Sequence, residues 1–210
     1  MGFACTMPRM SDEMQEIAAV AAQLVVEDGL RFGPAKNHAL RQLGLPARTA
    51  LPSNELIEDA VREHLQLFHA DTHALYLWQL RKVALHWMEL MQAFEPYLTG
   101  AVWLGYASQL SDVDLDLYVD DPKAPEIALI NQDIAYDVGQ IDAGRREPVP
   151  VLHVVERVRD WPHGVGVYMR VHDRGALRGA LLPDGRGRPP RGNVAAVQAL
   201  LSLQDGAIHD

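Results

Sequence analysis

The spacing of apolar residues changes its period at Pro96, and this change constrains the fold more than any other feature of the sequence. Before Pro96, apolar residues recur at intervals of three and four, which is typical of amphipathic helices. After it, several short stretches alternate between apolar and polar residues or are rich in β-branched residues, which is typical of strands. We therefore expect an α+β protein with a helical N-terminal half packed on a small mixed β-sheet.

The pattern predicts three regions: a helical region over residues 1–95, an α+β domain over 96–180, and a Pro/Gly/Arg-rich loop followed by a C-terminal helix over 181–210. In the first region, Ser11 and Ser53 stand where helix N-caps are expected. Gly29 and Gly44 stand where helices end. The longest helical pattern ends before Pro96, and it is apolar nearly all round, which favours a central, buried helix.

In the second half, four stretches are predicted to be strands: 111–119, 134–141, 149–158 and 165–172. A short helix is expected over 125–132, after a Pro-rich turn. The run over 181–193 is rich in Pro, Gly and Arg and is predicted to be a loop. Asn193 is the expected N-cap of a final helix.

Composition excludes several classes of protein. The net charge of −9 argues against sequence-independent binding to a nucleic-acid backbone, which needs clustered Lys and Arg. The single cysteine, Cys5, allows no internal disulfide and favours a reducing compartment, so we expect a cytoplasmic protein. No apolar run is long enough to span a bilayer, and we expect no membrane partner. The sequence contains neither a P-loop nor a Rossmann glycine motif.

Asp112, Asp114 and Asp116 alternate with apolar residues in the stretch "SDVDLDLYV". On a strand, Val113, Leu115 and Leu117 would face a core and the three aspartates the other side. Like charges at this spacing repel one another, so the row is destabilising unless something neutralises it. A divalent cation such as Mg²⁺ would do so, since it is commonly held by one or two carboxylates plus substrate phosphates. The alternative is an edge strand whose charged face is solvated and blocks aggregation.

The residues upstream of the three aspartates favour the interpretation that they bind a metal ion. Gly100-Ala101 is followed by ten residues and then by Asp112-Val113-Asp114-Leu115, and Gly105 lies between. This spacing resembles the signature of the DNA polymerase β-type nucleotidyltransferase superfamily, in particular its minimal nucleotidyltransferase branch. That signature is a Gly-Ser pair followed after about ten residues by an "SDxDL" string. The resemblance is strong over about 20 residues and weak over 98–173.

This resemblance implies a fold of the nucleotidyltransferase type and a magnesium-dependent transfer of a nucleoside monophosphate. The donor would be an NTP, with ATP the first expectation, and the acceptor a hydroxyl of a protein, an RNA or a small molecule. Asp112 and Asp114 would be catalytic and hold Mg²⁺, and Asp173 or Asp137 would supply a third carboxylate. The phosphate-binding turn would comprise Gly100, Ala101, Gly105 and Ser111.

The chain also departs from the signature. Ala101 stands in place of the serine whose hydroxyl would contact phosphate. Tyr168 stands near the position at which some branches carry the third acid. The alternative hypothesis is therefore an inactive, nucleotidyltransferase-like binding or regulatory protein, which could act as a homodimer. A toxin–antitoxin pair is a further context, because many minimal nucleotidyltransferases belong to one.

Three other sequence patterns each allow two interpretations, one functional and one structural. His69 and His73 are four residues apart, a spacing that suits zinc on one helix face and equally suits capping or interface histidines. The arginines between Arg174 and Arg191 could contact a triphosphate or RNA, or form a solvated loop. Gly2 and Thr6 match the loose pattern for N-myristoylation. The simpler interpretation is that these residues belong to a frayed N-terminus.

Overall fold

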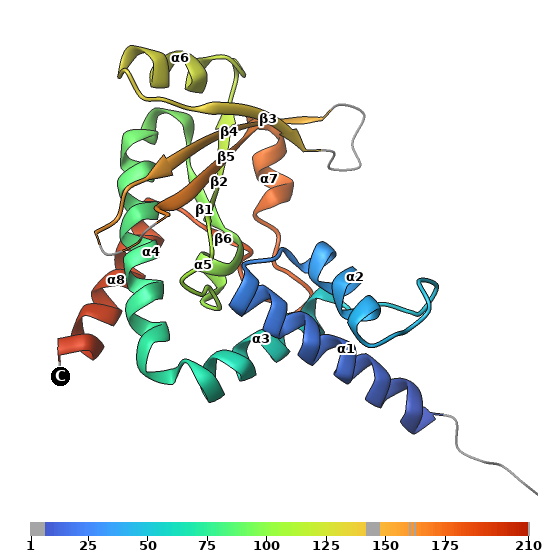
Figure 1. The fold of residues 1–210 in the computed structure, drawn as a ribbon. Helices are drawn as coiled ribbons and strands as arrows, with labels where there is room; N and C mark the ends of the chain where they lie inside the picture. The colour runs from blue at the N-terminus through green and yellow to red at the C-terminus, as the bar shows by residue number, and fades with distance from the viewer. Residues whose placement is uncertain (1–6, 142–147, 160, 162, 210) are drawn as a thin grey trace, which may run out of the picture. The chain divides into compact units, whose positions relative to one another are not determined.

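The structure, a computed structural model, describes residues 7–141, 148–159, 161 and 163–209 (Figure 1). They fall into two compact units. Unit 1 ends at residue 73 and also includes residues 108–110, and unit 2 comprises residues 74–107 and everything from 111 onward. The predicted α+β class and the mixed sheet are confirmed. The predicted boundaries at residues 95 and 180 stay a prediction.

Unit 1 is helical. It contains α1 (Met7–Asp28), α2 (Phe32–Gln42) and α3 (Asn54–Phe68), and α4 (Ala70–Leu90) begins at its end. Apolar side chains on one stripe of each of the first three helices are buried together, among them Ile17, Ala21, Leu24, Ala39, Leu40, Ile57, Val61 and Leu65. Because each stripe is narrow, these helices are stabilised mainly by packing against one another rather than by intrinsic propensity.

The helix starts are partly as predicted. Ser53 is the N-cap of α3, and its hydroxyl accepts a hydrogen bond from the backbone N–H of Leu56 at 3.1 Å. The prediction for Ser11 is wrong, since α1 already begins at Met7. Pro8 lies in the first turn of α1, where a missing backbone N–H costs no hydrogen bond. Gly2 and Thr6 lie outside the described residues.

Unit 2 contains a six-stranded mixed sheet in the order β3-β4-β5-β2-β1-β6. Its strands are β1 (Tyr97–Thr99), β2 (Val113–Val119), β3 (Asp137–Ile141), β4 (Val149–Glu156), β5 (Val165–Asp173) and β6 (Arg191–Gly192). Only the central pair β2 and β5 is parallel among these pairings. The aspartate strand β2 therefore lies inside the sheet, so the edge-strand interpretation of its charges is wrong.

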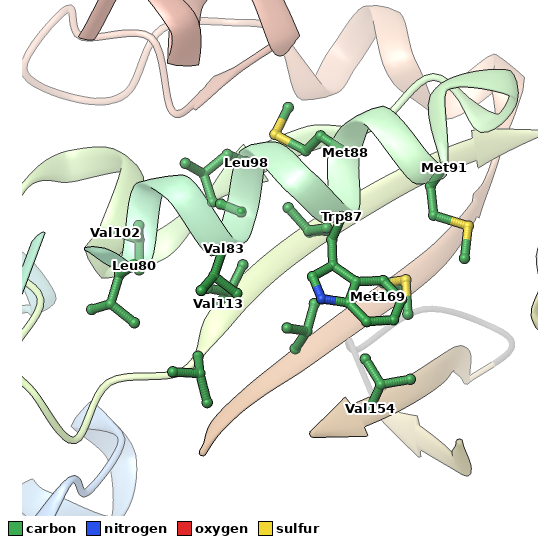
Figure 2. Packing of buried hydrophobic residues seen from close by; sticks show 14 of the residues in the cluster. Leu80, Val83, Trp87, Met88, Met91, Leu98, Val102, Val113, Val154 and Met169 are labelled. Carbon is green, nitrogen blue, oxygen red and sulfur yellow. The ribbon is translucent and has the colours of Figure 1, made fainter. Parts of the chain in front are cut away.

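One face of this sheet is apolar and packs against α4 (Figure 2). The helix contributes buried residues that include Leu80, Val83, Trp87, Met88 and Met91. The sheet contributes Leu98, Val113, Leu115, Leu117, Val154, Val167 and Met169, among others. Since side chains alternate across a strand, burial of these residues turns Asp112, Asp114 and Asp116 to the opposite face, as predicted.

Four elements of unit 2 were not predicted. Two are the short strands β1 and β6, and two are the helices α5 (Gly100–Leu104) and α7 (Leu177–Ala180). The helices α6 (Ala124–Asn131) and α8 (Val194–His209) were expected, and Asn193 caps α8 through a 3.0 Å bond from Ala196 N–H. Short 3-10 turns, η1 (Gln92–Phe94) and η2 (Arg174–Ala176), follow α4 and β5. In the described part of the chain, no helix has the length and apolar character needed to cross a membrane.

Candidate functional site

Gly100 joins strand β1 to helix α5 directly beside the acid row, by which we mean Asp112, Asp114 and Asp116. Its φ of +70° is in the left-handed region, which glycine adopts without a steric penalty. A Cβ atom at this position would lie 3.1 Å from Oδ2 of Asp114. Thr99, the preceding residue, is paired with Asp114 across the two strands. A glycine is therefore needed here both for the turn and for the close approach of the backbone to a carboxylate.

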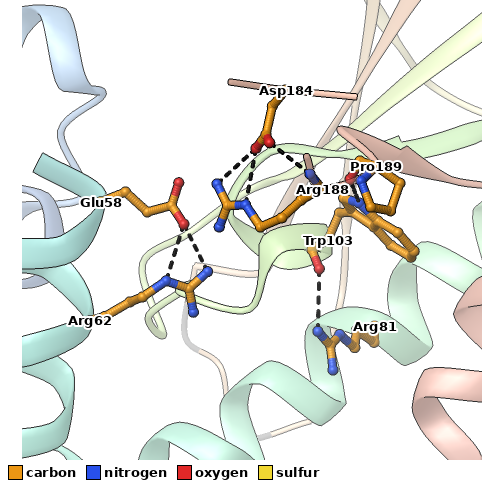
Figure 3. Close-up of polar contacts among 7 residues, drawn as sticks. All are labelled: Glu58, Arg62, Arg81, Trp103, Asp184, Arg188 and Pro189. Carbon is orange, nitrogen blue, oxygen red and sulfur yellow. Dashed lines mark hydrogen bonds and ion pairs between the residues drawn. The ribbon is translucent and has the colours of Figure 1, made fainter. Parts of the chain in front are cut away.

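Helix α5 is only five residues long, and side chains from distant segments hold it in place (Figure 3). The buried guanidinium of Arg81 donates to the carbonyl oxygens of Val102 and Trp103 at 3.2 and 3.4 Å. These carbonyl groups belong to the last turn of α5, where a nearby positive charge stabilises a helix. Burial lowers the pKa of Arg81 to about 10, so it is still charged at neutral pH. At the other side, Trp103 Nε1 donates to the carbonyl oxygen of Pro189 at 2.8 Å.

Asp116 is the most enclosed member of the acid row, with 4% of its surface exposed. Its Oδ1 accepts hydrogen bonds from Arg170 Nε at 2.9 Å and lies 3.1 Å from His172 Nε2, while its Oδ2 lies 2.5 Å from Arg191 Nη1. Arg170 also reaches Asp114, with Nη1 3.2 Å from Oδ1. Arg191 donates to the hydroxyl of Tyr118 as well. The charge that a metal was expected to neutralise is thus largely neutralised by side chains of the protein.

The surroundings of Asp116 hold its pKa below the ordinary value. Burial alone would raise this pKa, but the hydrogen bond with His172 and the charge and hydrogen bond of Arg170 lower it by more. A carboxylate with a depressed pKa contributes stability that is fully present above its unfolded pKa of about 3.9. That contribution is lost as the pH falls through the lower, folded-state pKa.

We therefore expect the free energy of unfolding to decrease as the pH falls below about 4, partly through Asp116. The Asp116→Asn variant cannot ionise here, so its stability should decrease less over the same range. Urea denaturation of both proteins at several pH values measures the difference. Parallel curves for the two proteins would contradict this assignment.

A cavity of about 610 Å³ opens on this polar face of the sheet. Its lining combines carboxylates, cations and the glycine turn: Thr99, Gly100, Asp114, Asp116, Tyr118, Arg170, His172, Ala176, Gly179, Ala180 and Arg191. We call this cavity the acid-row pocket. It brings together one predicted metal ligand, Asp114, one predicted turn residue, Gly100, and one arginine of the predicted arginine-rich segment, Arg191.

The other predicted site residues lie elsewhere. Asp112 precedes β2 and lies against Gly166, where an added Cβ would be 2.6 Å from its Oδ1. Gly105 ends α5 with a φ of +82° and lies near Arg81. Ala101 packs on the hydrophobic core, and Ser111 is half-buried at the entry to β2.

The candidates for a third carboxylate are not close to Asp114. Tyr168 is its partner on β5, and His153 stacks on Tyr168 with ring centroids 4.4 Å apart. Asp137 lies beyond His153 on β3, with Oδ2 3.8 Å from His153 Nδ1 and 90% of its side chain exposed. Asp173 pairs with a residue of the apolar face and caps Gly175 N–H at 2.7 Å. It lies about 16 Å along the strand from Tyr168.

Comparison with known proteins gives distant matches only. No protein-family model and no curated protein matches the sequence. A structure of Cid1 with the UTP analogue UMPNPP is similar at a TM-score of 0.37 and 13% identity, over 60% of this chain and 40% of that chain. The Cid1 poly(U) polymerase bound to MgGTP gives 0.36 and 15%, over 59% and 41%. A cytoplasmic RNA terminal U-transferase gives 0.36 and 16%, over 58% and 39%. This chain therefore spans about two-fifths of the length of each.

Proposed function

We propose that this protein is a nucleotidyltransferase of the DNA polymerase β type, which binds an NTP in the acid-row pocket. The observation that carries the proposal is the position of Gly100. Gly100 has a left-handed φ and begins helix α5 beside strand β2. A Cβ added to Gly100 would lie 3.1 Å from Asp114 Oδ2. Turns of this kind can present backbone N–H groups to phosphates beside a carboxylate, which is the arrangement that the proposal needs.

The cations of the pocket suit a triphosphate. Arg170, His172 and Arg191 all line it, and arginine presents several N–H donors that match phosphate oxygens. Arg170 and Arg191 are already held by Asp116, so their guanidinium groups are fixed in place before a ligand arrives. A charged group that is fixed in advance stabilises a developing negative charge without reorganisation.

Asp112 and Asp114 are the residues that would hold Mg²⁺. They stand two residues apart, Asp114 in the lining of the pocket and Asp112 just before β2 and outside that lining. Both supply the carboxylate oxygens that this ion prefers, one or two of which suffice beside substrate phosphates. Among the described residues, no group of three close metal-binding side chains includes either of them. The remaining ligands would therefore come from the nucleotide and water. When bound, the ion would supply Lewis-acid stabilisation of the phosphate charge.

In the proposed reaction, the acceptor hydroxyl oxygen forms a bond to the α-phosphorus, and the bond from that phosphorus to the pyrophosphate oxygen breaks. The proton of the hydroxyl must go to a base, and His172, which lines the pocket, is the residue that we propose accepts it. The acceptor is one of the three expected classes, a protein, an RNA or a small molecule. A cytoplasmic location, a toxin–antitoxin pairing and a homodimer stay predictions.

A second candidate is a non-catalytic nucleotide-binding or regulatory protein. Two observations favour it: Tyr168, not an acid, lies opposite Asp114, and Arg170 pairs with the Asp114 carboxylate. In this alternative, the arginine takes the place of the cation that a catalytic site would need. The pocket would still bind phosphates.

Transfer of label separates the two candidates. The full chain is incubated with each α-labelled NTP, Mg²⁺ and cell lysate, beside an Asp112→Ala/Asp114→Ala variant and an Asp71→Ala control with an exposed acid in unit 1. The transferase proposal predicts labelled macromolecular or small-molecule product with the wild type and the control, and none with the double variant. No product from any NTP, with binding retained, would favour the second candidate.

A further inference from the structure

Unit 1 holds a cluster of three side chains outside the acid-row pocket: Glu27 from the end of α1, His64 from α3, and His69, which follows α3. We call it the His–Glu cluster. Oε1 of Glu27 lies 3.2 Å from Nε2 of His64 and 3.3 Å from Nε2 of His69. One potential ligand atom from each residue lies within 4.8 Å of the other two. Both histidine nitrogens thus converge on the same carboxylate oxygen.

The backbone explains this convergence. His64 lies just before the last turn of α3, whereas His69 is the C-cap, with φ −131° and ψ 19°. Leaving the helix at His69 lets its ring approach that of His64, with centroids 5.9 Å apart. The sequence spacing predicted a pair of His69 and His73 instead. Among the described residues, His73 belongs to no group of three potential metal ligands.

The distances from Glu27 to the two histidines are compatible with a ligand set around a tetrahedral ion. With metal–ligand bonds of about 2.0–2.1 Å, two ligands of a tetrahedral zinc are about 3.3–3.4 Å apart. The two measured separations from Glu27 are close to this edge length. A hydrogen bond between a charged imidazole and a carboxylate is typically shorter, at about 2.7–2.9 Å. The same separations also fit long hydrogen bonds, so zinc binding itself distinguishes a ligand set from hydrogen bonds alone.

The cluster also opens on a cavity. A hollow of about 570 Å³ is lined by all three residues together with Ala19, Val20, Gln23 and Phe68. His64 is largely buried, with 15% of its side chain exposed, and Glu27 is half exposed. A set of two histidines and one carboxylate that faces a cavity leaves a position for a water or a ligand oxygen, as in zinc sites with three protein ligands.

We propose that the His–Glu cluster binds one Zn²⁺ ion through His64, His69 and Glu27, with an exchangeable oxygen ligand in the adjoining cavity. Two imidazoles and one carboxylate favour zinc and its neighbours in the transition series over Mg²⁺, which prefers oxygen ligands alone. The ligands come from two helices of unit 1, so a bound ion would join α1 to the end of α3. This site is separate from the proposed nucleotide pocket and does not depend on it.

Zinc titration of the full chain tests this proposal. Chelator-stripped protein is titrated with Zn²⁺ by calorimetry, with excess Mg²⁺ present in a second series. We expect one Zn²⁺ per chain, no competition from Mg²⁺, and a tetrahedral absorption spectrum when Co²⁺ replaces Zn²⁺. The His64→Ala/His69→Ala variant should lose at least about 100-fold in affinity, and Glu27→Gln, which keeps the side-chain shape, at least about tenfold.

His38→Ala is the matched control, because His38 is an exposed histidine of α2 outside the cluster. It should bind Zn²⁺ like the wild type. Circular dichroism of each variant establishes that the helices are retained, and Glu27→Gln remains informative if the double variant unfolds. Equal affinity in the wild type and both cluster variants would overturn the proposal. So would the absence of stoichiometric binding by the wild type, which would identify the cluster as hydrogen bonds alone.

Discussion

Replacing Asp116 with alanine is expected to lower the free energy of unfolding of unit 2 by about 2–3 kcal/mol, below the range for a fully uncompensated buried charge. The substitution leaves Arg170 and Arg191 without the carboxylate to which both are bonded, at a position where only 4% of Asp116 is exposed. An uncompensated buried cation is costly, because the surrounding protein solvates charge poorly. Arg170 keeps Asp114 as a partner, which places the expected loss below that for a fully isolated charge.

Urea denaturation followed by tryptophan fluorescence measures this loss in the relevant part of the chain. All four tryptophans, Trp78, Trp87, Trp103 and Trp161, belong to unit 2. Asp120→Ala is the control, since its carboxylate pairs with Arg174 at 3.0 Å but is 77% exposed. It should cost less than about 1 kcal/mol. A loss for Asp116→Ala as small as that of the control would show that these ion pairs do not stabilise unit 2.

The Gly100→Ala variant should lose stability and nucleotide transfer together. A left-handed φ of +70° costs a residue with a Cβ about 1–2 kcal/mol. The added methyl group would also press on Asp114 at 3.1 Å from Oδ2 and displace it. The carboxylate must give by a few tenths of an ångström. Because a displacement of about 1 Å at a reacting centre can cost about 100-fold in rate, transfer should fall by less than that, by roughly tenfold.

The Gly187→Ala variant separates the loss of stability from the loss of nucleotide transfer. Gly187 has a similar φ of +74°, but no atom lies within 4 Å of its added Cβ and it lies outside the acid-row pocket. It should lose similar stability and keep its transfer rate. Chemical denaturation and initial rates of label transfer give both quantities for each variant. If the two variants transfer label at the same rate, Gly100 is a turn residue without a role at the pocket.

Features that depend on local periodicity could be predicted from the sequence. The alternation around Asp114 was enough to predict strand β2 and the face on which its charges lie, because successive side chains of a strand must alternate. The N-caps Ser53 and Asn193 were predictable for the same reason, since a cap acts within three residues of itself. The all-round apolar pattern of α4 correctly indicated a helix packed on the core but overstated its burial, since its buried residues all lie between Leu77 and Met88.

The neutralisation of the acid row could not be predicted in this way. Arg170, His172 and Arg191 are 54, 56 and 75 residues from Asp116 in sequence, and only the pairing of β2 with β5 and the return of β6 bring them close. A weak signal existed, because Arg170 and His172 alternate with apolar residues just as the aspartates do. Their register against β2 depends on tertiary packing, which one sequence does not contain.

The same limit applies to the short elements and to unit 1. Helix α5 is too short to give a helical period, and it forms because Arg81 and Pro189 hold it from outside. Glu27 is 37 and 42 residues from its two histidine partners, so the sequence pointed to the neighbouring His73 instead. Both sites are made by packing of distant segments rather than by adjacent residues.

The central claim is that the acid-row pocket binds an NTP, and the melting temperature of the full chain with each of the four NTPs tests it most directly. A ligand that binds only the folded protein stabilises it by about 2.7 kcal/mol at 100 times its Kd. In a chain of this size that corresponds to a rise of roughly 5–10 °C. We predict such a rise, with Mg²⁺ present, for at least one NTP, and a smaller one in Gly100→Ala. An unchanged melting temperature with all four NTPs at millimolar concentration would contradict the claim.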